Sequence, residues 1–375
     1  MTAQPITGRG CRQQAPATVA RRRRKSVVVL RYPARYAECV RARYPSYRLV
    51  AASALFLGTA TGMPGLYPWV GTQPRVAQAE PYALPTDSVL PRAGFVATGG
   101  PLPSSFLDAS TNVRHVVIIS EDGMRPELIT QQQRMQWHQL LAKNGAYSWR
   151  ARTIRTASTL PSHASMLSGV DVNLHGLTWN NWRPQKGYIQ VPTIFKAAED
   201  QGLKTAAFVG KFKLRHILPP GTVDVFQRPG YYCKKVSEEA ARYIEREKPA
   251  LTFVHFSDPD EKGHSAGWMS EDQKRAARDA DACLGTIYQA IERAGILSDT
   301  LVIVSADHGG HNHNHSGALL SDRNIPWIAM GPGVRRGYSI QGPISTMDTA
   351  ATALAVLGLR PQTRLTGKPI REIFQ

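Results

Sequence analysis

Cysteine is scarce in this sequence, and its spacing excludes one class of site. The 375 residues include four cysteines, with Cys11 and Cys39 near the N-terminus and Cys233 and Cys283 in the body of the chain. No two of them form a C-x-x-C pair, the spacing typical of cysteine-ligated zinc, so no such site is expected. In an exported protein Cys233 and Cys283 could form a disulfide, and two separately buried thiols are the equal alternative.

Acidic residues are almost absent from the first 79 residues. This segment holds 13 lysines and arginines but a single acid, Glu38, so it carries most of the formal net charge of +18. The rest of the chain is only mildly basic and has no basic stripe with interleaved aromatic residues, which is the pattern of a nucleic-acid-binding surface. We therefore expect no nucleic-acid binding by the folded domain.

An uncharged stretch from Leu49 to Pro74 follows the basic residues of this N-terminal segment. Its apolar first part has the length of a signal-peptide core, and the small residues Ala77 and Ala79 form a cleavage-site pattern. The stretch is also just long enough to span a bilayer, so an uncleaved membrane anchor is the alternative. The sequence thus predicts an exported protein, periplasmic or extracellular, with residues 1–79 as a basic leader.

Residues 80–113 are rich in Pro, Gly, Ser and Ala and are expected to form a linker. From residue 114 to residue 375, apolar β-branched runs alternate with helical patterns, which is typical of an α/β domain. The predicted strands are His115–Ser120, Thr205–Val209, Leu251–Phe256, Thr300–Ser305 and Ile325–Met330. The predicted helices are Pro126–Asn144, Ala164–Ser168, Val191–Gly202, Ser237–Lys248, Ser270 to about Ala294, and Thr349–Leu357.

Acidic residues and histidines follow three of these strands, at the point where each strand ends. They are Asp122 after the first strand, Asp260 and His264 after Leu251–Phe256, and Asp307 and His308 after Thr300–Ser305. Open α/β sheets place their sites at the carboxyl ends of strands, and carboxylate and imidazole groups are ligands for first-row metals. A turn cap at Asp122 and a solvated His-rich loop are the plainer readings, but the repetition favours two adjacent metal sites.

A hydroxyl group is predicted at the entrance of a helix near residue 159. Thr159 begins the sequence Thr-Leu-Pro-Ser-His, where a loop is expected to pass into a helix whose free N–H groups can face an anion. Metal coordination would activate such a hydroxyl as a nucleophile. A simple helix cap is the alternative role for this residue. Either Asn180 or Asn181, in a polar and aromatic loop, offers an amide donor nearby.

Taken together, these motifs resemble those of the alkaline phosphatase superfamily, and most closely its nucleotide pyrophosphatase/phosphodiesterase branch. The resemblance runs from about Arg114 to the end of the chain and implies a central, mostly parallel mixed sheet with helices on both faces. The matching motifs are Asp122-Gly123, Thr159 to His163, His175-Gly176 with Asn180, Asp260-x-x-Gly263-His264, Asp307-His308-Gly309 and a later His before Gly.

The resemblance also implies a site with two Zn²⁺ ions, or other divalent metals. One ion would take Asp122, Asp307 and His308, and the other Asp260, His264 and His315. Thr159 would contact the metal as the nucleophile, and Asn180 would stabilise the phosphoryl oxygens. His315 is preferred over His311 and His313 because the family's histidine usually precedes a small residue and Gly, as Ser316-Gly317 does here.

The function implied is a two-zinc hydrolase that cleaves phosphodiester or pyrophosphate bonds through a phosphoryl-threonine intermediate. The substrate would be a small phosphorylated molecule such as a nucleotide, with Lys211, Trp179 and Tyr231 lining the pocket. The run at Thr159 lacks the Cys/Ser-x-Pro-x-Arg signature of sulfatases. Phosphomonoesterases of the superfamily usually present a serine and an added cationic clamp, so monoester or phosphonate hydrolysis is the alternative. A catalytically silent, exported metal-binding protein is the alternative of another class.

Overall fold

The computed structural model describes residues 112–317 and 319–375. The predicted leader and nearly all of the predicted linker lie outside these residues, so the expected signal peptide or anchor stays a prediction. Within the described part of the chain, no helix is both long enough and apolar enough to cross a membrane.

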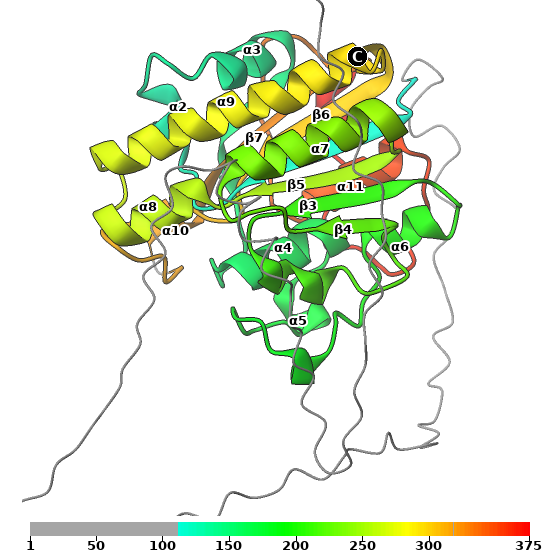
Figure 1. The fold of residues 1–375 in the computed structure, drawn as a ribbon, viewed down its shortest axis with the longest axis horizontal. Helices are drawn as coiled ribbons and strands as arrows, with labels where there is room; N and C mark the ends of the chain where they lie inside the picture. Colours follow the sequence, from blue (N-terminus) through cyan, green and yellow to red (C-terminus); the bar gives the residue numbers. More distant parts are fainter. Residues whose placement is uncertain (1–111, 318) are drawn as a thin grey trace, which may run out of the picture. The chain divides into compact units, whose positions relative to one another are not determined.

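The described residues build one mixed sheet (Figure 1) with the strand order β4-β3-β5-β1-β6-β7-β2-β8. Strands β4, β3, β5, β1 and β6 are parallel, whereas β7 runs antiparallel to both β6 and β2. The predicted mostly parallel mixed sheet is confirmed. The strands are β1 His115–Glu121, β2 Ala146–Arg152, β3 Thr205–Val209, β4 Val225–Gln227, β5 Leu251–Phe256, β6 Thr300–Ser305, β7 Asn324–Met330 and β8 Tyr338–Ser339.

Helices pack in two groups on the two faces of this sheet, as predicted. One group contains α2 Pro126–Thr130, α3 Gln136–Asn144, α7 Cys233–Glu247, α8 Asp258–Ala266 and α9 Glu271–Arg293, with α9 in contact with all the others. The second group contains α4 Thr159–Ser168, α5 Val172–His175, α6 Ile194–Glu199 and α11 Asp348–Val356, gathered around α4. The short helix α10 covers Leu320–Arg323.

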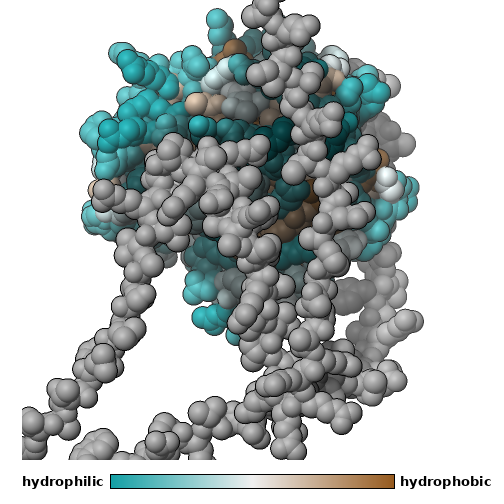
Figure 2. Space-filling view, viewed as in Figure 1, coloured by the Kyte–Doolittle hydropathy of each residue, from teal (hydrophilic) through white to brown (hydrophobic). Residues whose placement is uncertain are grey.

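The central strands are apolar because both of their faces are covered. The residues of β5 and β6 are fully buried, including Phe253 and Phe256. Burial of each such side chain stabilises the fold by roughly 1.5–3 kcal/mol. The face shown in Figure 2 is mostly hydrophilic where the described residues are visible. The buried stripe predicted for α9, which includes Leu284, Ile287 and Ile291, is confirmed.

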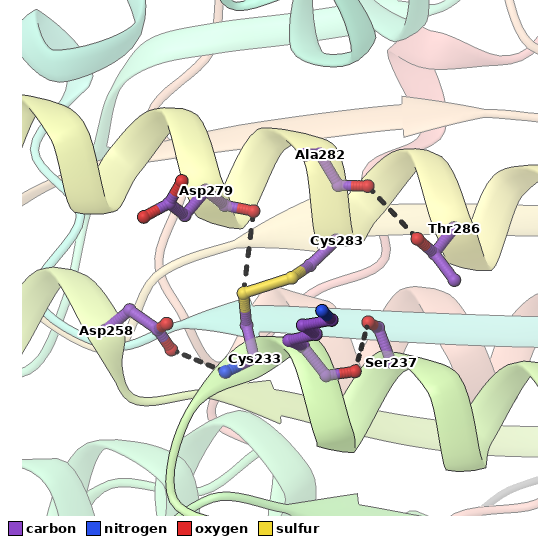
Figure 3. Close-up of a disulfide and its surroundings, with 8 residues drawn as sticks. Cys233, Ser237, Asp258, Asp279, Ala282, Cys283 and Thr286 are labelled. Atoms are coloured by element: carbon purple, nitrogen blue, oxygen red, sulfur yellow. Dashed lines mark hydrogen bonds between the residues drawn. A yellow bond between two sulfur atoms is a disulfide. The ribbon is translucent and has the colours of Figure 1, made fainter.

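A disulfide joins Cys233, the first residue of α7, to Cys283 in the middle of α9 (Figure 3). The two Cα atoms are 6.0 Å apart. The N–H of Cys233 donates to Asp258 Oδ2 at 2.8 Å, so the start of α7 is also tied to the start of α8. Of the two arrangements open from the sequence, the structure has the disulfide.

One predicted helix was wrong, and tertiary contacts explain why. The expected helix Pro126–Asn144 is two helices, α2 and α3, separated by residues 131–135. The carboxylate of Asp281, on α9, accepts the N–H groups of Trp137 and His138 and so satisfies the free donors at the start of α3. Other helix starts also differ from the predicted ones. Helix α6 begins at Ile194 rather than Val191, α7 at Cys233 rather than Ser237, and α4 at Thr159 rather than Ala164.

Candidate active site

Three acidic residues meet at one edge of the sheet because the strands before them are neighbours. Strand β1 lies between β5 and β6, so Asp122, Asp260 and Asp307 follow adjacent parallel strands. The backbone turns at Gly123, whose φ is +72°, and a Cβ there would lie 2.9 Å from the Cα of Asp260. Gly123 is therefore needed both for its left-handed conformation and for space. Its N–H donates to Asp307 Oδ1 at 3.1 Å.

The first candidate metal group contains Asp122, Asp307 and His308, whose possible ligand atoms all lie within 4.8 Å of one another. His308 Nε2 is 3.4 Å from Asp122 Oδ1 and 3.4 Å from Asp307 Oδ2. The opposite nitrogen, Nδ1, lies 2.8 Å from the carbonyl oxygen of Gly309 and therefore carries the hydrogen. The three converging atoms are buried and have no hydrogen-bond partner among the described residues.

The second candidate group contains Asp260, His264 and His315 and meets the same distance limit. Asp260 and His264 lie one turn apart on α8, so both side chains project from one face of the helix. His264 Nδ1 donates to the carbonyl of His313 at 2.9 Å, and His315 Nδ1 donates to the carbonyl of Ala157 at 2.7 Å. The Nε2 atoms therefore face Asp260 Oδ1, at 3.3 Å from His264 and 3.7 Å from His315.

The structure separates the three histidines that the sequence left as alternatives. His315 lies with Asp260 and His264, whereas His311 pairs with Asp322 at 2.6 Å and His313 donates to the carbonyl of His264 at 3.0 Å. Asp322 also accepts the N–H of Gly317 at 2.9 Å and so shapes the loop. Sequence reasoning missed Asp322, which lies in no recognisable motif. The assignment of His315 as a ligand remains a prediction, now with a geometry that suits it.

Lys211 lies between the two groups, as expected for a residue directly after β3. Its Nζ is 2.7 Å from Asp122 Oδ2 and also contacts Asp260. Burial would lower the pKa of Lys211, but the carboxylates of Asp122 and Asp260 raise it above its ordinary value. Burial would likewise raise the pKa of Asp122, but Lys211, His255 and His308 bring it well below its ordinary value. The carboxylates are therefore ionised, as metal ligands must be.

Thr159 is the first residue of α4, and its side chain is buried beside this edge of the sheet. Its Oγ1 has no hydrogen-bond partner among the described residues, and it makes no helix-cap bond. His163 fixes the backbone here: its Nδ1 donates to the carbonyl of Thr159 at 2.7 Å, and its Nε2 accepts from Ser120 Oγ at 2.8 Å. Burial lowers the pKa of His163 to about 4, so the ring is neutral. The threonine hydroxyl is thus positioned but unbonded.

Asn180 and Lys213 lie together at the start of α4. Asn180 Oδ1 accepts the N–H of Leu160 at 2.9 Å and a hydrogen from Lys213 Nζ at 3.0 Å, which leaves the Asn180 amide hydrogens to donate elsewhere. Burial, followed by the charge of Lys211, lowers the pKa of Lys213 to about 8. Sequence reasoning missed Lys213, although its place two residues after Lys211 puts it at the same sheet edge.

The two aromatic residues predicted to line the pocket have their own described partners. Trp179 packs edge-on against His216, with ring centroids 5.6 Å apart, and Lys186 Nζ lies 4.6 Å from the Trp179 ring centroid. Tyr231 Oη donates to Glu261 Oε2 at 3.4 Å. The role of Trp179 and Tyr231 in substrate binding remains a prediction.

Comparison with known proteins decides the family. Residues 116–363 match the family model described as type I phosphodiesterase / nucleotide pyrophosphatase. The chain belongs to this family. The type I phosphodiesterase / nucleotide pyrophosphatase family is a branch of the alkaline phosphatase superfamily, so the resemblance inferred from the motifs is confirmed.

Solved structures support the same fold. Murine ectonucleotide pyrophosphatase/phosphodiesterase 5 superimposes with a TM-score of 0.60 at 14% identity, covering 70% of this chain and 100% of that chain. The phosphonate monoester hydrolase of Agrobacterium radiobacter superimposes with a TM-score of 0.56 at 17% identity, covering 70% of this chain and 77% of that chain. At these identities the likeness shows the fold of the family and not the reaction.

Curated relatives of this family member match over shorter stretches. A 2,3-bisphosphoglycerate-independent phosphoglycerate mutase from Synechococcus elongatus is 25% identical over 229 residues, which are 56% of this chain and 40% of the mutase. A rat ectonucleotide pyrophosphatase/phosphodiesterase family member 7 is 23% identical over 176 residues, which are 40% of each protein. This chain thus spans only 40% of the length of these two relatives.

Proposed function

We propose that this protein is a metal-dependent phosphoric ester hydrolase that holds two Zn²⁺ ions and cleaves phosphodiester or pyrophosphate bonds through a phosphoryl-threonine intermediate. The first ion would bind Asp122, Asp307, His308 and Thr159, and the second would bind Asp260, His264 and His315. The substrate would be a small phosphorylated molecule, with a nucleotide as the first candidate. Membership of the family supports this class of reaction.

One observation carries the proposal: three histidines present their Nε2 lone pairs to clustered carboxylates. His264, His308 and His315 each donate Nδ1–H to a backbone carbonyl, so Nε2 is the nitrogen of each ring that can bind a metal. The Nε2 atoms of His264 and His315 lie 3.1 Å apart, close enough to share one proton when no metal is bound. A divalent metal would take the place of that proton, because imidazole nitrogens and carboxylate oxygens are zinc ligands.

The bound ions would supply Lewis acidity that lowers the pKa of a hydroxyl and neutralises charge on the phosphoryl group. The protein's own groups would do the rest. Thr159 Oγ1 would attack phosphorus, and its bond to phosphorus would form as the bond to the leaving oxygen breaks. Asn180 Nδ2 and Lys213 Nζ would hold a phosphoryl oxygen, and water would later hydrolyse the phosphoryl-threonine. An inactive threonine-to-alanine variant of murine ectonucleotide pyrophosphatase/phosphodiesterase 5 has been solved with AMP, which is in keeping with a threonine and a nucleotide.

A second reaction is favoured by the half-buried cation near Asn180, Lys213. Lys213 and Lys211 add positive charge beyond the two metal groups, which is the cationic clamp expected of an enzyme that acts on dianionic phosphate monoesters or on phosphonates. Lys211 is already paired with two carboxylates, so Lys213 is the residue that would contact the extra substrate charge. Monoester or phosphonate hydrolysis is therefore the second candidate function.

The test is a rate comparison with the purified, zinc-loaded protein. The substrates are an aryl phosphodiester, a dinucleoside pyrophosphate, an aryl phosphomonoester, a phosphonate and an aryl sulfate. We expect the highest kcat/KM for a diester or pyrophosphate, and no sulfatase activity. Faster turnover of the monoester or phosphonate would transfer the assignment to the second candidate. No turnover of any of them by a zinc-loaded protein would instead indicate a catalytically silent metal-binding protein.

Export is proposed on two independent grounds. The basic leader with its apolar stretch predicts a signal peptide, or else a membrane anchor, and the Cys233–Cys283 disulfide suits an oxidising compartment. If the leader is cleaved after Ala79, N-terminal sequencing of the secreted protein should begin at Glu80. Full-length protein confined to the cytoplasm would contradict export. Nucleic-acid binding by the folded domain is not proposed.

A further inference from the structure

His255 is a fully buried histidine in the middle of the sheet, and it belongs to neither metal group. It lies on β5, opposite Ser120 of β1 and Val209 of β3, and its exposed fraction is 0%. Its neighbours along the strand, Val254 and Phe256, are apolar. A buried imidazole must satisfy both ring nitrogens, so the partners of His255 reveal what the ring does.

The partners of His255 fix its tautomer. His255 Nε2 lies 2.9 Å from Asp122 Oδ2, and because an ionised carboxylate can only accept, the hydrogen is on Nε2 and His255 donates. The backbone N–H of Gly210 donates to the carbonyl of His255 at 3.1 Å and also reaches Nδ1 at 3.3 Å, which leaves Nδ1 as an acceptor. A Cβ at position 210 would meet the Ser257 side chain and lie 2.5 Å from the carbonyl oxygen of Tyr231. A side chain at position 210 would therefore force this backbone to shift.

We propose that His255 is a positioning residue that turns the Asp122 carboxylate so that Oδ1 faces the first metal group. Because a carboxylate is planar, a donor that holds Oδ2 also sets the direction of Oδ1. Asp122 Oδ1 has no hydrogen-bond partner among the described residues and lies 3.4 Å from His308 Nε2. The inference rests on the proposed metal site and adds a residue to it that does not itself contact the metal.

Lys211 does not replace His255 in this role, although its Nζ also lies 2.7 Å from Asp122 Oδ2. Lys211 is a flexible side chain that is shared with Asp260, so its position depends on both metal groups. His255 is rigid by comparison. Its ring packs edge-on against His163, with centroids 5.0 Å apart, and its donor reaches Asp122 alone.

The test measures zinc affinity in the full-length protein, by competition with a chromogenic chelator. His255→Leu removes the donor, whereas His255→Gln keeps an acceptor for the N–H of Gly210 and a donor for Asp122. Thr252→Val, on the same strand and also buried, is the matched control. We expect His255→Leu to lower the affinity for one of the two zinc ions roughly 10–100-fold, as is typical when a group that orients a metal ligand is removed. His255→Gln should recover most of this affinity, and Thr252→Val should bind both ions like the wild type.

Two outcomes separate this inference from the proposed function. If the wild type binds two zinc ions and folded His255→Leu binds them equally well, the positioning role is overturned while the metal site stands. If the wild type binds no zinc, both are overturned. Should His255→Leu fail to fold, ¹⁵N NMR of the wild-type imidazoles decides, with the His255 signals identified by their loss in His255→Gln. A hydrogen on Nε2 supports the inference, and a hydrogen on Nδ1 overturns it.

Discussion

The Nε2 atoms of His264 and His315 lie 3.1 Å apart, and each ring donates a hydrogen bond from Nδ1 to a backbone carbonyl. The two residues come from separate elements, α8 and the loop after β6, so the contact is a property of the fold. Without a metal the two nitrogens can share one proton, and the hydrogen bond to Asp260 raises the pKa of His264 above its ordinary value. A divalent cation held by both Nε2 atoms and Asp260 would displace that proton, so the contact suits the proposed second metal group.

The first prediction concerns this pair. His315→Ala should weaken zinc binding at the second group by more than about 100-fold, because even groups that only orient a ligand typically contribute 10–100-fold. The zinc content at a fixed low free-zinc concentration should fall from two ions per chain towards one, measured by mass spectrometry of the metal. His313→Ala is the matched control, since the His313 side chain belongs to neither metal group and donates to the backbone carbonyl of His264. A similar loss in both variants would contradict the assignment.

The second prediction concerns the nucleophile. Thr159→Ala should reduce turnover by several orders of magnitude, because it removes the attacking oxygen from a unit of groups that act together. Zinc content should change little, since each ion keeps three other protein ligands. Thr159→Ser should retain measurable turnover, and Ser158→Ala, which changes the neighbouring hydroxyl, should be mild. Near-normal turnover of the alanine variant with zinc bound would mean that water attacks phosphorus directly.

The sequence predicted the parts of this site that depend on local pattern. Asp122, Asp260 and Asp307 follow apolar runs whose bounds as strands were predicted almost to the residue. Neighbouring parallel strands end at one edge, so the meeting of these residues followed from their positions along the chain. The choice of His315 rested on a family pattern, and the structure adds the geometry that the pattern could not give.

Other features could not be predicted because they depend on residues far apart in the sequence. The break between α2 and α3 depends on Asp281, which caps α3 from 144 residues away. Strand β2, which was missed, is stabilised by its antiparallel pairing with β7 rather than by an apolar run of its own. His255 looked like an ordinary strand residue until Gly210 and Asp122 were placed on either side of its ring.

The third prediction concerns stability and pH. His138 is fully buried between Glu121 and Asp281, at 2.8 Å and 2.7 Å. Burial would lower the pKa of His138, but the two carboxylates raise it from 6.5 to about 9. Because the folded pKa is the higher one, this stabilisation is complete below the unfolded pKa of 6.5 and is lost as pH rises through about 9. The shift in pKa corresponds to a contribution on the order of a few kcal/mol to the free energy of unfolding.

Urea unfolding of the wild type and His138→Gln at several pH values tests this. Gln can still donate to one buried carboxylate but does not titrate, so the comparison cancels contributions that the two proteins share. We expect the wild type to be the more stable protein at pH near 6, and the difference in unfolding free energy to shrink steadily up to pH near 10. A difference that stays constant across this range would show that His138 does not hold a proton in the folded protein.

The last prediction concerns Lys213 and the choice of substrate. Lys213 Nζ lies 3.0 Å from Asn180 Oδ1 at the start of α4, where a phosphoryl group would bind. Burial and then Lys211 lower the pKa of Lys213 to about 8, so the ammonium form that attracts an anion is lost as pH rises through 8. Lys213→Met should therefore reduce kcat/KM for a dianionic monoester by roughly 10–100-fold or more, since hydrogen bonds to charged groups contribute about 1.5–3 kcal/mol. The loss for a monoanionic diester should be smaller.

Lys213→Arg is the control, because arginine keeps its charge at all working pH values. The fall in monoester kcat/KM above pH 8 that loss of the Lys213 charge causes should therefore be absent from this variant. Parallel pH profiles of kcat/KM for both substrates and all three proteins provide the measurement. Equal losses for both substrates in Lys213→Met would show that Lys213 does not distinguish monoesters from diesters.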